Sequence, residues 1–85
     1  MTEAKVTIKA AVGLHARPAA SLVEEAMKHS SRVEVEAGGR KADGKSILQV
    51  LALGVQCGHQ IVIRAYGTDE AETVKLLTGI LDRTG

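Results

Sequence analysis

Residues 32 to 43 read RVEVEAGGRKAD, and this stretch decides the fold. Its first half alternates valine with glutamate, which is the period of a strand that buries one face and exposes the other. Gly38 and Gly39 then separate this run from a second short one, RKAD. Two glycines between such runs predict a tight hairpin, because primed two-residue turns need positive φ angles. A sheet covered on one side only favours antiparallel strands with helices packed on a single face.

The other elements follow from the change of period along the chain. Residues 4–10 and 60–66 read as strands, whereas three further stretches have helical spacing, from about His15 to Ser30, from Ser46 to Leu53 and from Thr68 to Arg83. The element order is therefore β-α-β-β-α-β-α. The side chains expected to form the buried stripes of the first and last helices are Ala19, Leu22, Val23, Ala26 and Met27, and Ala71, Val74, Leu77 and Leu81.

Composition limits the kind of protein that the chain can be. With 85 residues and 45% apolar residues we expect one domain over residues 1–85, working as a monomer. The net charge of +1 and the single aromatic residue, Tyr66, argue against nucleic acid as a partner. Cys57 stands alone, and the chain opens with neither an apolar export segment nor a membrane span. We therefore expect a cytoplasmic protein without membrane contact.

One motif in the chain suggests nucleotide binding. Residues 39–46, GRKADGKS, satisfy the GxxxxGKS spacing of loops that bind the phosphates of ATP. Such a loop follows a fully buried strand, but here the preceding VEVEA exposes its glutamates. The first glycine is better used in the hairpin turn, and RKAD alternates like a strand. We interpret the match as a hairpin followed by a helix start.

A second motif, AVGLHARPAASL at residues 11–22, brings together a histidine, an arginine and the only proline. Proline lacks a backbone N–H and is well suited to the first turn of a helix, so Pro18 indicates that His15 is the N-cap. The unpaired amides of Ala16 and Arg17 would then face outward, at a helix end that carries about half a positive charge. With the Arg17 guanidinium, these groups form a predicted anion site.

His15 has two interpretations at this position. A neutral imidazole beside an anion site is a competent nucleophile that needs no general base. Alternatively, His15 only caps a helix near a surface arginine, and the spacing alone leaves both interpretations open. No second histidine, cysteine or acid stands at ligand spacing, so we expect no metal.

The motif resembles that of a known family. GLHARPAA, followed by KSIL and then LALG, is similar over essentially the whole chain to HPr, the histidine-containing phosphocarrier family of the bacterial sugar phosphotransferase system. The resemblance implies an α+β open-faced β-sandwich, in which three helices cover one face of a four-stranded antiparallel sheet. Val12 departs from the family pattern, which commonly has a polar residue there.

The resemblance also implies a chemistry. His15 would accept a phosphoryl group on Nδ1 from enzyme I, itself charged by phosphoenolpyruvate, and pass it to IIA domains of sugar permeases. Arg17 matches the family's phosphate-binding arginine, and no cofactor is implied. Ser46 matches the serine that HPr kinase/phosphorylase modifies in many Gram-positive bacteria, which makes the protein a regulator that binds a transcription regulator. The protein would be a phosphorylated carrier rather than a turnover enzyme.

The short apolar stretch SILQVLALG carries the expected partner surface. One helix cannot bury all its apolar residues in a one-sided core, so we expect Ile47, Leu48 and Leu51 to form a docking patch beside His15. Val50 and Leu53 would face inward. A short helix buried on all sides is the alternative. Arg17, Lys45 and Arg40 are expected to surround the site and to favour acidic partners.

Two other functions share these residues. A carrier of the nitrogen branch would use the same His15 for regulation instead of sugar import. An interaction module that acts only through phosphorylation of Ser46 would not need the nucleophile.

Overall fold

The computed structural model describes residues 1–83. Its elements follow the predicted order β-α-β-β-α-β-α. The strands are β1 (Thr2–Thr7), β2 (Arg32–Ala37), β3 (Arg40–Asp43) and β4 (Gln60–Tyr66), and the helices are α1 (Ala16–Met27), α2 (Ile47–Ala52) and α3 (Glu70–Arg83).

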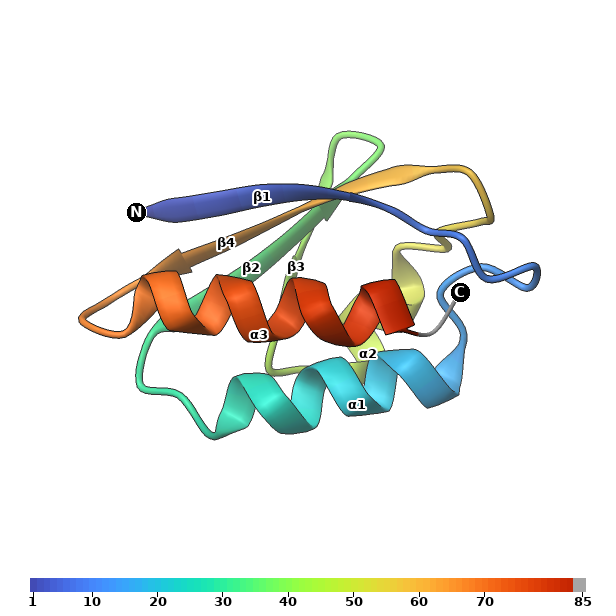
Figure 1. Cartoon of the computed structure of the whole chain (residues 1–85). Helices are drawn as coiled ribbons and strands as arrows, with labels where there is room; N and C mark the ends of the chain where they lie inside the picture. Colours follow the sequence, from blue (N-terminus) through green and yellow to red (C-terminus); the bar gives the residue numbers. More distant parts are fainter. Residues whose placement is uncertain (84–85) are drawn as a thin grey trace.

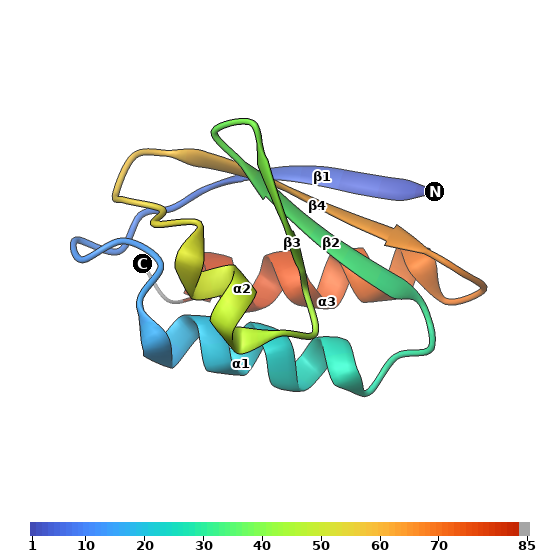
Figure 2. The same cartoon turned by 180° about the vertical axis from the view of Figure 1, so that it is seen from behind.

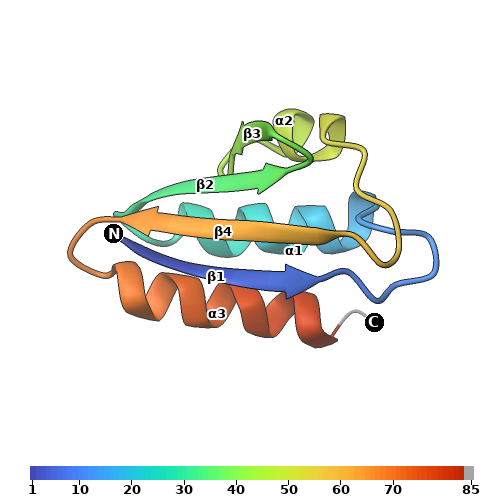
Figure 3. The same cartoon turned by 90° about the horizontal axis from the view of Figure 1, so that it is seen from above.

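The four strands form one antiparallel sheet in the order β1-β4-β2-β3. All three helices lie on the same side of this sheet, and its other side is open (Figures 1 and 2). Viewed from above, α1 and α3 run lengthwise beneath the strands, whereas α2 lies near β3 (Figure 3). The predicted α+β open-faced sandwich is confirmed.

The hairpin that decides the fold forms as predicted. Gly38 and Gly39 have φ angles of 58° and 79°, and the flanking residues Ala37 and Arg40 pair across the turn. Both angles lie in the left-handed region, which glycine adopts without steric cost. On β2, Val33 and Val35 are buried, and the alternating residues Glu34 and Glu36 face the open side.

The aliphatic core lies between the sheet and the helices, with Leu22, Ile61, Ile63 and Leu77 fully buried. The residues predicted to form the buried stripes of α1 and α3 are buried, except at two positions. Met27 is 66% exposed, because Val23 already lies at the edge of the buried stripe and a residue four positions later is rotated by a further ~40°. Ala71 is also exposed, and Thr73 is buried in its place.

No helix within residues 1–83 is long and apolar enough to cross a membrane.

Candidate functional site

His15 stands exposed at the start of α1. It is the N-cap residue, as predicted, with an extended backbone (φ −92°, ψ −175°), and its carbonyl oxygen accepts the N–H of Ala19 at 3.1 Å. Its side chain makes no capping hydrogen bond. The imidazole is therefore free to react rather than occupied in holding the helix end.

The first amides of α1 are also free. Within the described part of the chain, the backbone N–H groups of Ala16 and Arg17 donate to no protein acceptor. Pro18, in the same turn, is buried and has no N–H to satisfy. Two donors and the positive end of the helix dipole thus lie next to the His15 ring, which is the arrangement that binds anions.

His15 and Arg17 line a cavity of about 380 Å³. Its walls are formed by His15, Arg17, Pro18 and Ser21 of the first two turns of α1 and by Arg83 of α3. Figure 1 shows why α3 contributes, since α1 begins close to where α3 ends. The cavity therefore combines a nucleophile with two guanidinium groups from different helices.

The loop that leads into His15 is held against the rest of the molecule by Gly13. This residue is buried with a φ of +76°, and a Cβ added to it would overlap the carbonyl oxygen of Val55. The next residue, Leu14, donates its N–H to that same oxygen at 3.0 Å, and the N–H of His15 reaches the Gly13 carbonyl oxygen at 3.1 Å. Only glycine permits this approach, which fixes the backbone on the N-terminal side of the nucleophile.

Helix α2 presents part of its apolar surface to solvent. Leu48 is 78% exposed, whereas Val50 is buried. Ile47, Leu51 and Leu53 are half-buried and pack against the core. The alternative of a helix buried on all sides is therefore wrong, and an exposed leucine with half-buried neighbours is available to a partner.

Ser46 is the N-cap of α2, and its Oγ accepts the N–H of Gln49 at 3.3 Å. The residue is partly exposed. Its hydroxyl thus has a structural role in the unmodified protein.

Two basic residues expected around His15 are elsewhere. The ammonium of Lys45 donates to the carbonyl oxygen of His29 at 2.8 Å, beyond the C-terminal end of α1, and Arg40 begins β3 at the hairpin turn. Neither lines the cavity. Arg83 takes this place, and the sequence reasoning missed it, because no periodic pattern shows that the end of one helix meets the start of another.

The GxxxxGKS match forms no phosphate-binding loop. The amide of Gly44 donates to the Val33 carbonyl oxygen at 2.8 Å, and that of Ser46 to the Asp43 carbonyl oxygen at 3.0 Å. Between them, the amide of Lys45 donates to the Asp43 carboxylate at 2.9 Å. With these donors used and RKAD paired as β3, the interpretation as a hairpin and helix start agrees with the structure.

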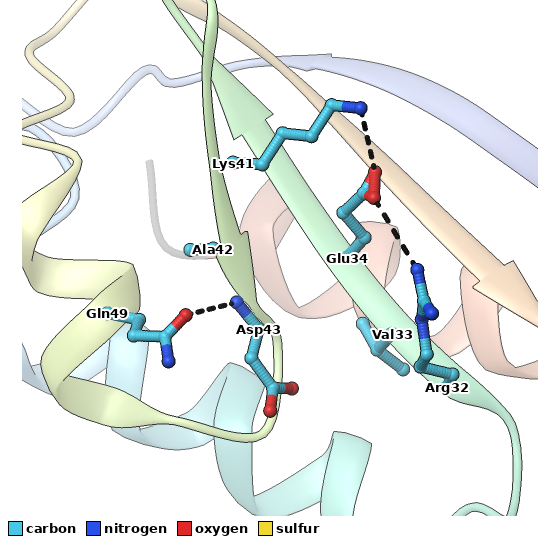
Figure 4. Close-up of a pocket in the computed structure, with 7 residues that line it drawn as sticks. All are labelled: Arg32, Val33, Glu34, Lys41, Ala42, Asp43 and Gln49. Carbon is cyan, nitrogen blue, oxygen red and sulfur yellow. Dashed lines mark hydrogen bonds and ion pairs between the residues drawn. The ribbon is translucent and has the colours of Figure 1, made fainter.

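A second cavity, of about 310 Å³, lies between β2, β3 and α2 (Figure 4). Its polar groups are largely paired with one another. Glu34 lies 4.0 Å from both Lys41 and Arg32, and the Asp43 amide donates to the Gln49 side-chain oxygen at 2.9 Å. It contains no histidine, serine or cysteine.

His29 takes part in a charged cluster at the opposite end of α1. Its side chain is only 10% exposed, with Nε2 2.8 Å from Glu25 and Nδ1 3.3 Å from Asp69. The hydrogen bond to Glu25 raises the pKa of His29. The Ser31 hydroxyl and the amides of Ser30 and Ser31 lower the pKa of Asp69 to about 2.

This cluster joins the end of α1 to the start of α3. It lies at the opposite end of α1 from His15 and contributes no group to the His15 cavity. Within residues 1–83, no group of three or more histidine, cysteine or acidic side chains is arranged to bind a metal.

Comparisons with known proteins show the family of this chain. A family model described as the PTS HPr component phosphorylation site matches residues 2–83. A structure of HPr from Thermoanaerobacter tengcongensis is 40% identical, with 99% of this chain and 94% of that one covered and a TM-score of 0.93. The histidine-containing phosphocarrier protein of Mycoplasma is 34% identical, with 98% and 94% covered and a TM-score of 0.94.

A third similar structure is the catabolite repression protein Crh of Bacillus subtilis, described as a domain-swapped dimer. It is 36% identical, with 99% of this chain and 97% of that one covered and a TM-score of 0.78.

Proposed function

The chain belongs to the HPr family of the bacterial phosphotransferase system, and we propose that it carries a phosphoryl group on Nδ1 of His15. The observation that supports this most directly is the exposed His15 ring, which makes no capping bond and lines a cavity with Arg17. A ring that served only to cap the helix would bond to the amides behind it.

The chemistry requires an imidazole whose Nδ1 lone pair is free and whose proton is on Nε2. Nδ1 attacks the phosphorus of the incoming phosphoryl group, a P–N bond forms, and the bond to the donor's leaving atom breaks with its electron pair. While the proton stays on Nε2, the phosphorylated ring carries a positive charge, and loss of this proton to solvent leaves a neutral ring. The reverse step, in which an acceptor nucleophile attacks phosphorus and Nδ1 leaves, returns the free ring.

The surroundings of His15 would stabilise the phosphoryl oxygens. The amides of Ala16 and Arg17 supply two donors fixed by the helix, and the Arg17 guanidinium supplies a charged fork suited to phosphate. Because these groups are already in place before transfer, they need little reorganisation when negative charge arrives. No metal or cofactor has a part in this scheme.

The partners are a donor, enzyme I, and acceptors, the IIA domains of sugar permeases, all met in the cytoplasm by a monomer. Leu48 with its half-buried neighbours Ile47 and Leu51 would form the docking patch. Phosphorylation of Ser46 by HPr kinase/phosphorylase would add close to two negative charges at the edge of this patch. Such a charge would repel acidic partners and favour binding of a transcription regulator instead.

The similarity to Crh, a catabolite repression protein, supports a regulatory module as a second candidate, and in this module Ser46 alone would be phosphorylated. The two candidates differ in whether the His15 ring takes up phosphate, so one experiment separates them.

We would incubate the protein with phosphoenolpyruvate and enzyme I and then test the label for acid lability and stability to alkali. We expect one labile phosphoryl group, lost in His15→Ala and retained in the matched variant His59→Ala, which removes an exposed histidine outside the cavity. An acid-stable label, or equal labelling of His15→Ala, would defeat the carrier function. Repeating the reaction with enzyme I of the nitrogen branch identifies the branch.

A further inference from the structure

The His15 cavity has a second guanidinium group, which does not come from the motif at residues 11–22. Arg83 is the last residue of α3 and lines the cavity together with His15 and Arg17. The side chain is exposed, and within residues 1–83 no carboxylate forms an ion pair with it. A free cation in the wall of an anion-binding cavity is available to an anionic ligand.

The position of Arg83 is set by the helix behind it. A Cβ added at Gly79 would lie 3.7 Å from Nη1 of Arg83, so the guanidinium folds back along α3 over the preceding turn. Long side chains on helices run in this direction, toward the N-terminus of the helix. The glycine leaves open space under the guanidinium, which therefore lies along the cavity wall.

Charge explains why a cation is needed here. The C-terminal end of α3 carries a partial negative charge, and this end lies near the start of α1 (Figure 1). Without a cation, the end of α3 would oppose the positive end of α1 and weaken the site for a dianion. Arg83 offsets this effect and adds a second fork for oxyanions.

We propose that Arg83 is a second phosphoryl-binding residue of this protein, which holds the oxygens of the phosphoryl group on His15 from the side of α3. The inference rests on the proposed function, because it requires a phosphoryl group at that position. Since Arg83 meets this group only after transfer, it stabilises the phosphorylated form relative to the free form. If Arg83 only neutralised the end of α3, it would also favour the dianion, but it would not contact the phosphoryl oxygens, and its Nε resonance would not move on phosphorylation.

A competition between variants tests this directly. Wild type and Arg83→Gln are mixed in equal amounts with catalytic enzyme I and too little phosphoenolpyruvate to phosphorylate both. Phosphoryl groups then exchange to equilibrium, and intact mass spectrometry gives the share carried by each protein. Lys75→Gln, which removes an exposed cation from the same helix outside the cavity, is the matched control.

We expect Arg83→Gln to carry about two- to fivefold less phosphoryl group than wild type, as for one exposed charge pair, and the difference to shrink as salt rises. Arg83→Lys should recover part of the loss, and Lys75→Gln should share equally with wild type. In wild type labelled with ¹⁵N, the Arg83 Nε resonance should shift on phosphorylation.

Equal sharing by Arg83→Gln, or an Arg83 Nε resonance that does not move on phosphorylation, would overturn the role of Arg83 and leave the carrier function intact. Absence of any label on wild-type His15 would instead overturn the proposed function itself.

Discussion

The backbone N–H of Leu14 donates to the carbonyl oxygen of Val55 across 3.0 Å, and this bond holds the loop before His15 against the loop before β4. Gly13 makes the approach possible, because any larger residue would place a Cβ on the same oxygen. The orientation of the nucleophile thus depends on a contact between two segments that lie far apart in the sequence.

The first prediction concerns this contact. Gly13→Ala should lower the free energy of unfolding by about 2 kcal/mol or more, from the left-handed φ and the overlap with Val55. Urea unfolding measures this change. Gly79→Ala is the matched control, because its Cβ meets only an ordinary contact at 3.7 Å; replacing a glycine inside a helix should stabilise by about 0.5–1 kcal/mol. Equal effects at the two positions would contradict the account of Gly13.

The second prediction concerns His29 and pH. Its pKa is raised in the folded protein above the ordinary value of 6.5 by the hydrogen bond to Glu25, so the stability that it contributes is complete below about pH 6.5. This contribution is lost as the pH rises through the folded-state pKa. Urea unfolding of wild type and His29→Gln between pH 5 and 9 should show a difference that narrows with increasing pH. A difference that widens would contradict the assignment.

The third prediction concerns Asp69 and acid. Its pKa is lowered from 3.8 to about 2, mainly by the Ser31 hydroxyl, so its contribution is complete above about pH 4 and disappears as the pH falls through 2. Asp69→Asn should therefore unfold with a shallower dependence on pH in this range than wild type. Circular dichroism during acid titration measures both slopes, and parallel curves would count against the prediction.

The fourth prediction concerns the cap of α2. Ser46→Ala removes the acceptor of the Gln49 amide and should lower the free energy of unfolding by about 1 kcal/mol, measured by urea unfolding. Ser46→Asp keeps an acceptor and should stay close to wild type in stability, yet its added charge should slow labelling of His15 by enzyme I. If Ser46→Asp is labelled as fast as wild type, charge at this position does not control docking.

The fifth prediction concerns the docking patch. Leu48→Ala should change stability by less than about 0.5 kcal/mol, because the side chain is 78% exposed. Labelling of His15 by enzyme I should slow by about tenfold at low protein concentration, as expected for loss of one interface anchor worth about 1.4 kcal/mol. Leu76→Ala, a similar truncation of an exposed leucine on α3, is the control. Equal rates for the two variants would place the docking surface elsewhere.

Local patterns predicted most of the fold. The glycine pair at 38–39 gave a hairpin, and Pro18 placed the start of α1 one residue after His15, because both depend on backbone angles available to single residues. Periodicity was less reliable at the ends of elements. Met27 and Ala71 fit their stripes by spacing, but the width of a buried stripe depends on what packs against it.

Charged side chains were the hardest to place. Lys45 was expected beside His15 and instead donates to the His29 carbonyl oxygen. The His29 side chain lies between two carboxylates, those of Glu25 and Asp69, which no spacing in the sequence indicates. Long side chains choose their partners after the helices have packed, so sequence spacing alone does not reveal them.

The sequence by itself determined that His15, Ala16 and Arg17 lie together at the start of α1, because they are neighbours within one helix start, whose geometry is local. The tertiary structure alone decided which residues from distant parts of the chain lie around His15 and Arg17. Arg83 lines the His15 cavity because α3 ends near the start of α1, and Gly13 is needed because its loop meets Val55. Both relationships arise from the packing of distant segments over one shared core, which no local pattern in the chain encodes.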